Sequence, residues 1–165
     1  MIKFLLLIML LLFTTTTAHS EDDPLEQLVK MTPNELLEVK IHQVLKKRKV
    51  MRPQYYAKLI AHSNYTVTEK KMAVALLVPE SRGDANAVNY NKTCFGAWQV
   101  NKGWKKKLGI KGSLFDPPVC LEAAMKVWNI HLKDGRGQRR AALVAYSGGA
   151  KGYVAKIENV LTALA

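Results

Sequence analysis

A single carboxylate, Glu80, follows an apolar stretch, and its type and position suit proton transfer. Residues 72–78 read Met-Ala-Val-Ala-Leu-Leu-Val, which predicts a helix with buried faces. A carboxyl group at the end of such a helix is partly desolvated, so its pKa rises and it can hold a proton near neutral pH. Glu80 is therefore a candidate general acid, and the alternative is a solvated glutamate at a helix end.

Cleavage of a glycosidic bond is one reaction that needs such an acid, because the leaving oxygen must be protonated. Most glycosidases add a second carboxylate as base or nucleophile. Between Glu80 and Gln99 the sequence has one other acidic residue, Asp84, which stands next to Gly83 and is better suited to capping a turn. The sequence therefore favours a site with one carboxylate.

The surroundings of Glu80 resemble the soluble lytic transglycosylase domain of the lysozyme-like superfamily. Three blocks carry the resemblance: Glu80-Ser81 with Ala87 and Gly96-Ala97-Trp98-Gln99, then Ala145-Tyr146-Ser147-Gly148-Gly149, and last Tyr153-Val154. The resemblance covers about residues 67–161. Small single-domain members that accompany secretion, pilus or conjugation machines look most similar, so such a machine is an expected partner.

This resemblance implies a reaction. The expected enzyme cleaves the β-1,4 bond between MurNAc and GlcNAc in peptidoglycan glycan strands, with the substrate's own N-acetyl group assisting. Glu80 would first donate a proton and then accept one from the C6 hydroxyl, which yields a 1,6-anhydro sugar without consuming water. No cofactor or metal is implied.

The resemblance also implies roles for other residues. Ser81 would hydrogen-bond in the site, Gln99 would orient a sugar group, and the Tyr146 hydroxyl would point towards Glu80. Ser147 stands where the family has Asn, and Trp98 stands where it has Met. The Trp98 ring would either stack on a sugar or fill the core.

Cys94 and Cys120 are the two cysteines of the chain. In an oxidising compartment an even pair predicts a disulfide, and two free buried thiols are the alternative.

The N-terminus reads as a secretory signal peptide. Lys3 precedes the apolar residues 4–13, and small polar residues follow to Ser20. We expect cleavage near Ala18 or Ser20 and a periplasmic or secreted protein; an uncleaved membrane anchor is the alternative.

The remaining residues predict a mainly α, lysozyme-like α+β fold with at most a small hairpin, placed in residues 84–93. We expect an N-terminal helical extension over residues 21–65 and the catalytic domain over residues 66–165. Capping boxes at Thr32 and Thr66 predict helix starts. Further helices are expected over residues 33–49, 53–61, 102–108 and 139–146, with one starting at Pro117 and one from Tyr153. Pro79 predicts a kink or an early helix end.

The net charge is +12, and beyond Ser81 fourteen Lys and Arg face five Asp and Glu. Such a surface attracts polyanions. We expect a monomer that binds the bacterial wall rather than nucleic acid, since no nucleic-acid motif is present. The rival interpretations are a hydrolytic muramidase using Asp84 as base, a non-catalytic wall-binding assembly factor, and a cationic membrane-active protein.

Overall fold

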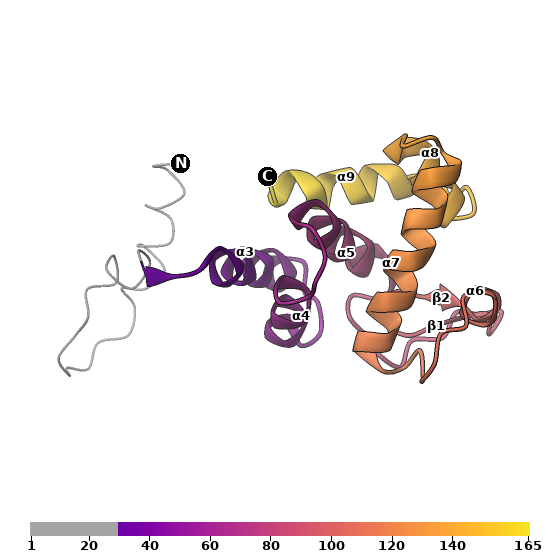
Figure 1. The fold of residues 1–165 in the computed structure, drawn as a ribbon, viewed down its shortest axis with the longest axis horizontal. Helices are drawn as coiled ribbons and strands as arrows, with labels where there is room; N and C mark the ends of the chain where they lie inside the picture. Colours follow the sequence, from indigo (N-terminus) through magenta and orange to yellow (C-terminus); the bar gives the residue numbers. More distant parts are fainter. Residues whose placement is uncertain (1–29) are drawn as a thin grey trace. The chain divides into compact units, whose positions relative to one another are not determined.

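The computed structural model describes residues 30–165, so the predicted signal peptide over residues 1–20 lies outside the described part. The described residues fall into two units, the first with residues 30–37 and the second with Glu38–Ala165. Helices dominate the described residues (Figure 1). They are α3 Pro33–Lys47, α4 Pro53–Ala61, α5 Val67–Glu80, α6 Lys102–Lys107, α7 Pro117–Asp134, α8 Arg139–Tyr146 and α9 Tyr153–Ala163. The predicted mainly α, lysozyme-like fold class is confirmed.

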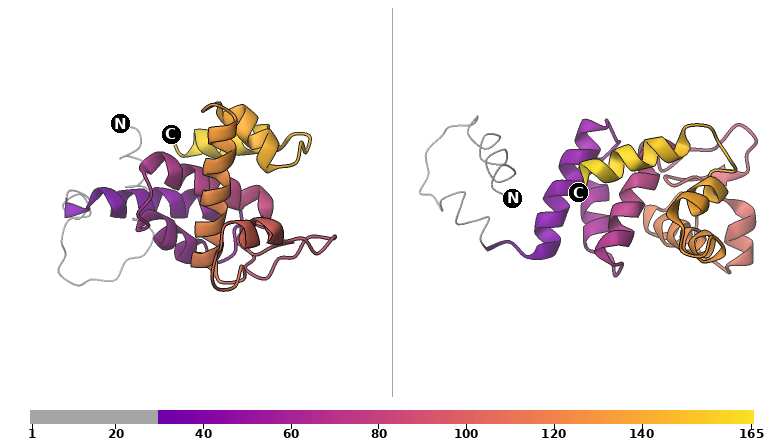
Figure 2. Two further views of the ribbon diagram at one scale, coloured as in Figure 1. Left: turned by 45° about the vertical axis from the view of Figure 1, so that its right-hand side comes forward. Right: turned by 90° about the horizontal axis from the view of Figure 1, so that it is seen from above.

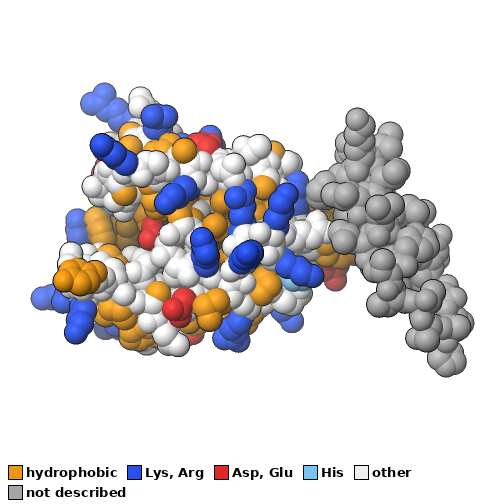
Figure 3. All heavy atoms as spheres, turned by 180° about the vertical axis from the view of Figure 1, so that it is seen from behind, with side chains coloured by type: hydrophobic (Ala, Val, Ile, Leu, Met, Phe, Trp, Pro, Cys, Tyr) orange, Lys and Arg blue, Asp and Glu red, His pale blue; other side chains and the backbone are white. Residues whose placement is uncertain are grey.

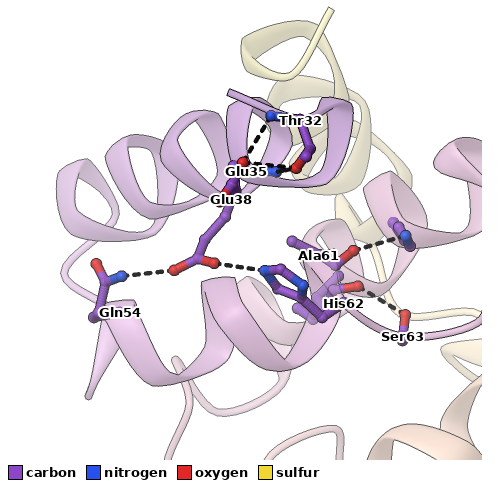
Figure 4. A network of polar contacts seen from close by, with 9 residues as sticks. Thr32, Glu35, Glu38, Gln54, Ala61, His62 and Ser63 are labelled. Carbon is purple, nitrogen blue, oxygen red and sulfur yellow. Dashed lines mark hydrogen bonds and ion pairs between the residues drawn. The ribbon is translucent and has the colours of Figure 1, made fainter. Parts of the chain in front are cut away.

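Local sequence signals set several of the helix starts. The Thr66 side chain accepts from the Glu69 amide, and the Glu69 carboxylate accepts from the Thr66 amide at 2.9 Å, which closes the predicted capping box at α5. In the first unit, Thr32 and Glu35 make the same reciprocal bonds at the start of α3 (Figure 4). Both boxes satisfy amides that have no partner inside the helix.

Within the second unit, a carboxylate fastens α3 to α4. The Glu38 carboxylate accepts from Gln54 Nε2 at 2.7 Å and lies 2.9 Å from His62 Nε2 (Figure 4). Ile41 and Leu45 on α3, and Ile60 on α4, are fully buried below this polar contact.

Helix α5 is the most thoroughly buried element of the described part. Six consecutive residues, 72–77, are at most 3% exposed, because α4, α7 and α9 all pack on this helix. Helix α9 runs beside α5, and α8 packs on α7 (Figures 1 and 2). Pro79 lies inside α5, which continues to Glu80, so the helix does not end early.

The small sheet forms later in the chain than predicted. Strands β1 Cys94–Phe95 and β2 Val100–Asn101 pair antiparallel, while the expected segment 84–93 contributes one bridge, from Val88 to Phe95. The Asn89 side chain explains the shift. Its Oδ1 accepts from the amides of Thr93 at 2.8 Å and Cys94 at 3.0 Å, so the side chain closes a turn over residues 89–93 and strand β1 begins only at Cys94.

Among the helices within residues 30–165, none combines the length and the apolar character needed to cross a membrane.

Candidate active site

The carboxyl group of Glu80 meets the hydroxyl of Tyr153 where the end of α5 lies against the start of α9. The Tyr153 hydroxyl donates to Glu80 Oε1 at 2.5 Å, across 73 residues of chain. Burial raises the pKa of Glu80 to about 7, and the hydrogen bond from Tyr153 opposes that rise. With a pKa of about 7, Glu80 is divided between its neutral acid and its carboxylate near neutral pH, a state suited to proton transfer.

Tyr153 itself stays protonated. Its burial and the neighbouring Glu80 charge both raise its pKa well above the ordinary value. It is consequently a permanent donor to Glu80. Sequence reasoning noted Tyr153 in a family block but gave it no role, because its partner is far away along the chain.

Tyr146 lies close by but takes a different contact from the one expected. Its hydroxyl donates to the Trp98 carbonyl at 3.4 Å, and the recorded hydroxyl contact of Glu80 is the one from Tyr153. Burial raises the pKa of Tyr146 well above its ordinary value, and the charge of Glu80 is the next cause. Tyr146 is thus a neighbour of Glu80, and its hydroxyl is held by the backbone of the loop formed by residues 96–99.

Ser81 ties the end of α5 to that loop. Its hydroxyl donates to the Ala97 carbonyl at 2.6 Å, which holds Glu80 and the segment 96–99 together. Asp84 is engaged locally: its Oδ1 accepts from the Asn86 amide at 2.9 Å, an Asx turn. The turn-capping role that the sequence favours for Asp84 is the one in the structure.

Gln99 adopts a left-handed backbone with φ of 49°, and its side chain closes the loop. Its Nε2 donates to the carbonyls of Ala87 at 3.0 Å and Gly96 at 2.9 Å. Within residues 30–165, Gln99 Oε1 has no recorded partner, so this oxygen is the part of the amide available to a sugar hydroxyl.

Trp98 is a core residue rather than a sugar-stacking surface. Its side chain is 0% exposed, its Nε1 donates to the Ala73 carbonyl at 2.8 Å, and its ring meets Tyr56 edge-on at 5.6 Å. Of the two roles considered for Trp98, the structure supports filling the core, because the indole N–H finds its partner on the buried helix α5.

The pocket beside Tyr146 has a volume of about 330 Å³ and is lined by Gln99, Ser147 and Gly148 among others. Two further rings line it. Trp104 and His131 are edge-on at 5.5 Å, and His131 is edge-on to Tyr146 at 6.2 Å. Burial lowers the pKa of His131, which favours the neutral imidazole. The sequence alone does not single out His131, since its ring neighbours Trp104 and Tyr146 lie on other elements.

The predicted disulfide is not formed in the structure, where Cys94 and Cys120 both have free thiols. The two sulfurs have different neighbours. Cys94 Sγ lies 3.8 Å from Thr93 Oγ1 and 3.9 Å from Asn101 Nδ2, whereas Cys120 Sγ contacts the Phe95 carbonyl at 3.7 Å. Burial raises the pKa of the Cys120 thiol to about 11, so this sulfur stays a protonated packing group.

Comparison with known families gives one match within this region of the chain. The family model described as "Transglycosylase SLT domain" matches residues 59–162, more than half of the chain. The match includes Glu80, Tyr146 and Tyr153. Comparisons with curated proteins and with solved structures give no match.

Proposed function

The chain belongs to the transglycosylase SLT domain family, and we propose that it cleaves the MurNAc–GlcNAc β-1,4 bond of peptidoglycan with Glu80 as its single acid and base. Family membership itself implies lytic transglycosylase activity on peptidoglycan in general. The bond, the product and the role of Glu80 are the proposal. The exported location predicted from residues 1–20 suits this substrate.

The proposed reaction has two proton transfers. The neutral Glu80 carboxyl gives its proton to the glycosidic oxygen as the bond from that oxygen to C1 breaks, and the substrate's N-acetyl oxygen stabilises C1. The Glu80 carboxylate then takes the proton of the C6 hydroxyl while the C6 oxygen bonds to C1. The products are a 1,6-anhydro end and a free GlcNAc hydroxyl, and Glu80 ends protonated as it began.

The contact between Glu80 and Tyr153 carries the proposal. A group with a pKa of about 7 holds a proton for the first transfer and accepts one in the second, at the same pH. The Tyr153 hydroxyl, 2.5 Å from Oε1, stabilises the carboxylate that exists between the two transfers. Asp84, engaged with the Asn86 amide, is poorly placed to serve as the base of a hydrolase.

The test is mass spectrometry of purified peptidoglycan after digestion by the mature protein, with Glu80→Gln alongside. We expect anhydro-muropeptides from the wild type and at least about a hundredfold fewer from the variant, because general acid–base catalysis alone contributes about 10²- to 10⁴-fold. Reducing-end muropeptides would instead mean a muramidase. Binding to peptidoglycan without any product would mean an assembly factor.

A further inference from the structure

A second pocket, of about 420 Å³, is lined in part by close sequence neighbours of Glu80 and carries three cationic side chains. Its lining includes Arg48, just after α3, Arg82, just after α5, and Lys156 on α9. Pro79 and Asn159 are among the other lining residues. The three positive charges thus converge from three separate parts of the second unit.

In the described part of the chain, these three cationic side chains form no ion pair. Within residues 30–165, the structure records no carboxylate within salt-bridge distance of Arg48, Arg82 or Lys156. Arg48 is nevertheless held in place, because its Nη2 donates to the Asn159 carbonyl at 3.4 Å and to Asn159 Oδ1. A guanidinium has five N–H donors in a rigid fork, so most of them remain for an anion.

Two of the three chain segments that line the pocket also carry Glu80 and Tyr153. Pro79 precedes Glu80, and Arg82 follows it by two residues. On α9, Lys156 lies three residues beyond Tyr153, so it is about one helical turn away on the same side. The Arg82 carbonyl accepts from the Met51 amide at 2.7 Å, which fixes the turn after α3 to the turn after Glu80.

We propose that this pocket binds the carboxylates of the peptide carried by the muramic sugar, so that the protein prefers peptide-bearing glycan strands. The inference rests on the proposed function. The lactyl group that carries the peptide is attached to the same sugar whose C1 bond is cleaved. A peptide bound to that sugar therefore begins beside Glu80, and the cationic pocket lies on the segments that flank Glu80 and Tyr153.

Arg48 is the one of these three cations that the family match does not cover. It lies before residue 59, where the family match begins, whereas Arg82 and Lys156 lie inside the match. The helices α3 and α4 would thus extend substrate recognition from the sugar to its peptide, by placing one guanidinium against the catalytic unit.

The test compares two soluble substrates: glycan strands that carry their peptides, and the same strands after an amidase has removed them. The measured quantity is the ratio of kcat/KM for the two strands. We expect the double variant Arg82→Gln with Lys156→Gln to lower this ratio by about tenfold, since a factor of ten corresponds to about 1.4 kcal/mol, the size of one charge-assisted hydrogen bond.

The control removes the same two charges elsewhere. Lys58 and Lys111 are exposed and line neither this pocket nor the one beside Tyr146, so Lys58→Gln with Lys111→Gln should keep the wild-type ratio. A ratio that falls equally in the control would overturn the proposal in favour of general charge attraction. Equal losses on both strands in the Arg82 and Lys156 variant would also overturn it.

Two outcomes separate this inference from others. A wild type that yields no anhydro product from either strand refutes the proposed function. A wild type that cleaves both strands equally well, and whose binding to phosphatidylglycerol vesicles is lost in the double variant, refutes the peptide and assigns the pocket to lipid phosphate.

Discussion

The hydroxyl of Tyr153 controls how strongly Glu80 holds its proton. Tyr153→Phe removes the bond that stabilises the carboxylate, so the pKa of Glu80 should rise above about 7. Because the acid must be protonated to act, the alkaline limb of the pH profile of kcat/KM should move to higher pH.

The matched control is Tyr146→Phe, whose hydroxyl contacts the Trp98 carbonyl instead of Glu80. The alkaline limb of the pH profile of kcat/KM should move less in Tyr146→Phe than in Tyr153→Phe. A limb that stays in place in Tyr153→Phe, or moves to lower pH, contradicts the assigned role of Tyr153.

Glu80 should also make stability depend on pH. Its pKa is raised from 4.5 to about 7 in the folded protein, so the folded state binds more protons than the unfolded state between these values. The contribution of Glu80 to folding therefore becomes less favourable as pH rises from 4.5 to 7, and is constant above.

Glu80→Gln removes this dependence. Relative to wild type, the variant should gain up to about 3 kcal/mol of unfolding free energy between pH 4 and pH 8, since 1.36 kcal/mol corresponds to one pKa unit. Urea unfolding of both proteins across this range measures the gain. A difference that is independent of pH would show that Glu80 is solvated.

Trp98 should affect stability more than substrate binding. Trp98→Phe leaves the Ala73 carbonyl without its indole partner and opens a small void, which should cost about 2–4 kcal/mol. Urea denaturation gives this number. A large rise in KM with unchanged stability would restore the sugar-stacking role.

At the scale of elements, the turn between α3 and α4 should support the catalytic segment through Gly83. A Cβ at Gly83 would lie 2.8 Å from both Tyr56 Cε2 and Val50 Cγ1 and 2.9 Å from the Met51 carbonyl oxygen. Gly83→Ala should therefore push the turn away from the residues after Glu80 and lower both stability and kcat.

Gly109→Ala is the control, because Gly109 also has a positive φ, of 61°, but a Cβ there meets nothing within 4 Å. It should cost only the backbone strain of about 1–2 kcal/mol, with kcat unchanged. Equal effects of the two substitutions on thermal unfolding and turnover would mean that the Gly83 contacts are unimportant.

The same scale explains what the sequence could and could not predict. A capping box such as that of Thr66 and Glu69 has both partners within four residues, so the sequence alone predicts the start of α5. The hairpin was predicted too early in the chain, because the Asn89 side chain accepts hydrogen bonds from the amides of Thr93 and Cys94. Strand propensity alone would assign these two amides to strand pairing. The apolar helix before Glu80 predicts that this carboxyl group is partly buried. Its contact with Tyr153 cannot be predicted in the same way, because it depends on how α9 packs on α5.

For the whole molecule, the charge of +12 should make wall binding sensitive to salt. Lys and Arg side chains are spread over the face in Figure 3, with few acidic groups between them. Raising ionic strength shortens the Debye length from about 10 Å at 0.1 M to about 3 Å at 1 M. We expect KM for intact peptidoglycan to rise severalfold over this range while kcat stays constant, measured by release of soluble fragments.

The contact between Glu80 and Tyr153 also means that the ribosome synthesises Glu80 well before its hydrogen-bond partner. Since 73 residues separate the two, a ribosome adding about 5–20 residues per second needs roughly 4–15 s to reach Tyr153 after Glu80. During that interval the nascent chain carries its acid without the hydroxyl that tunes it and without the helix that buries it. Under the proposed mechanism, a half-made copy should therefore be inactive, and activity should appear only once α9 has been synthesised and folded.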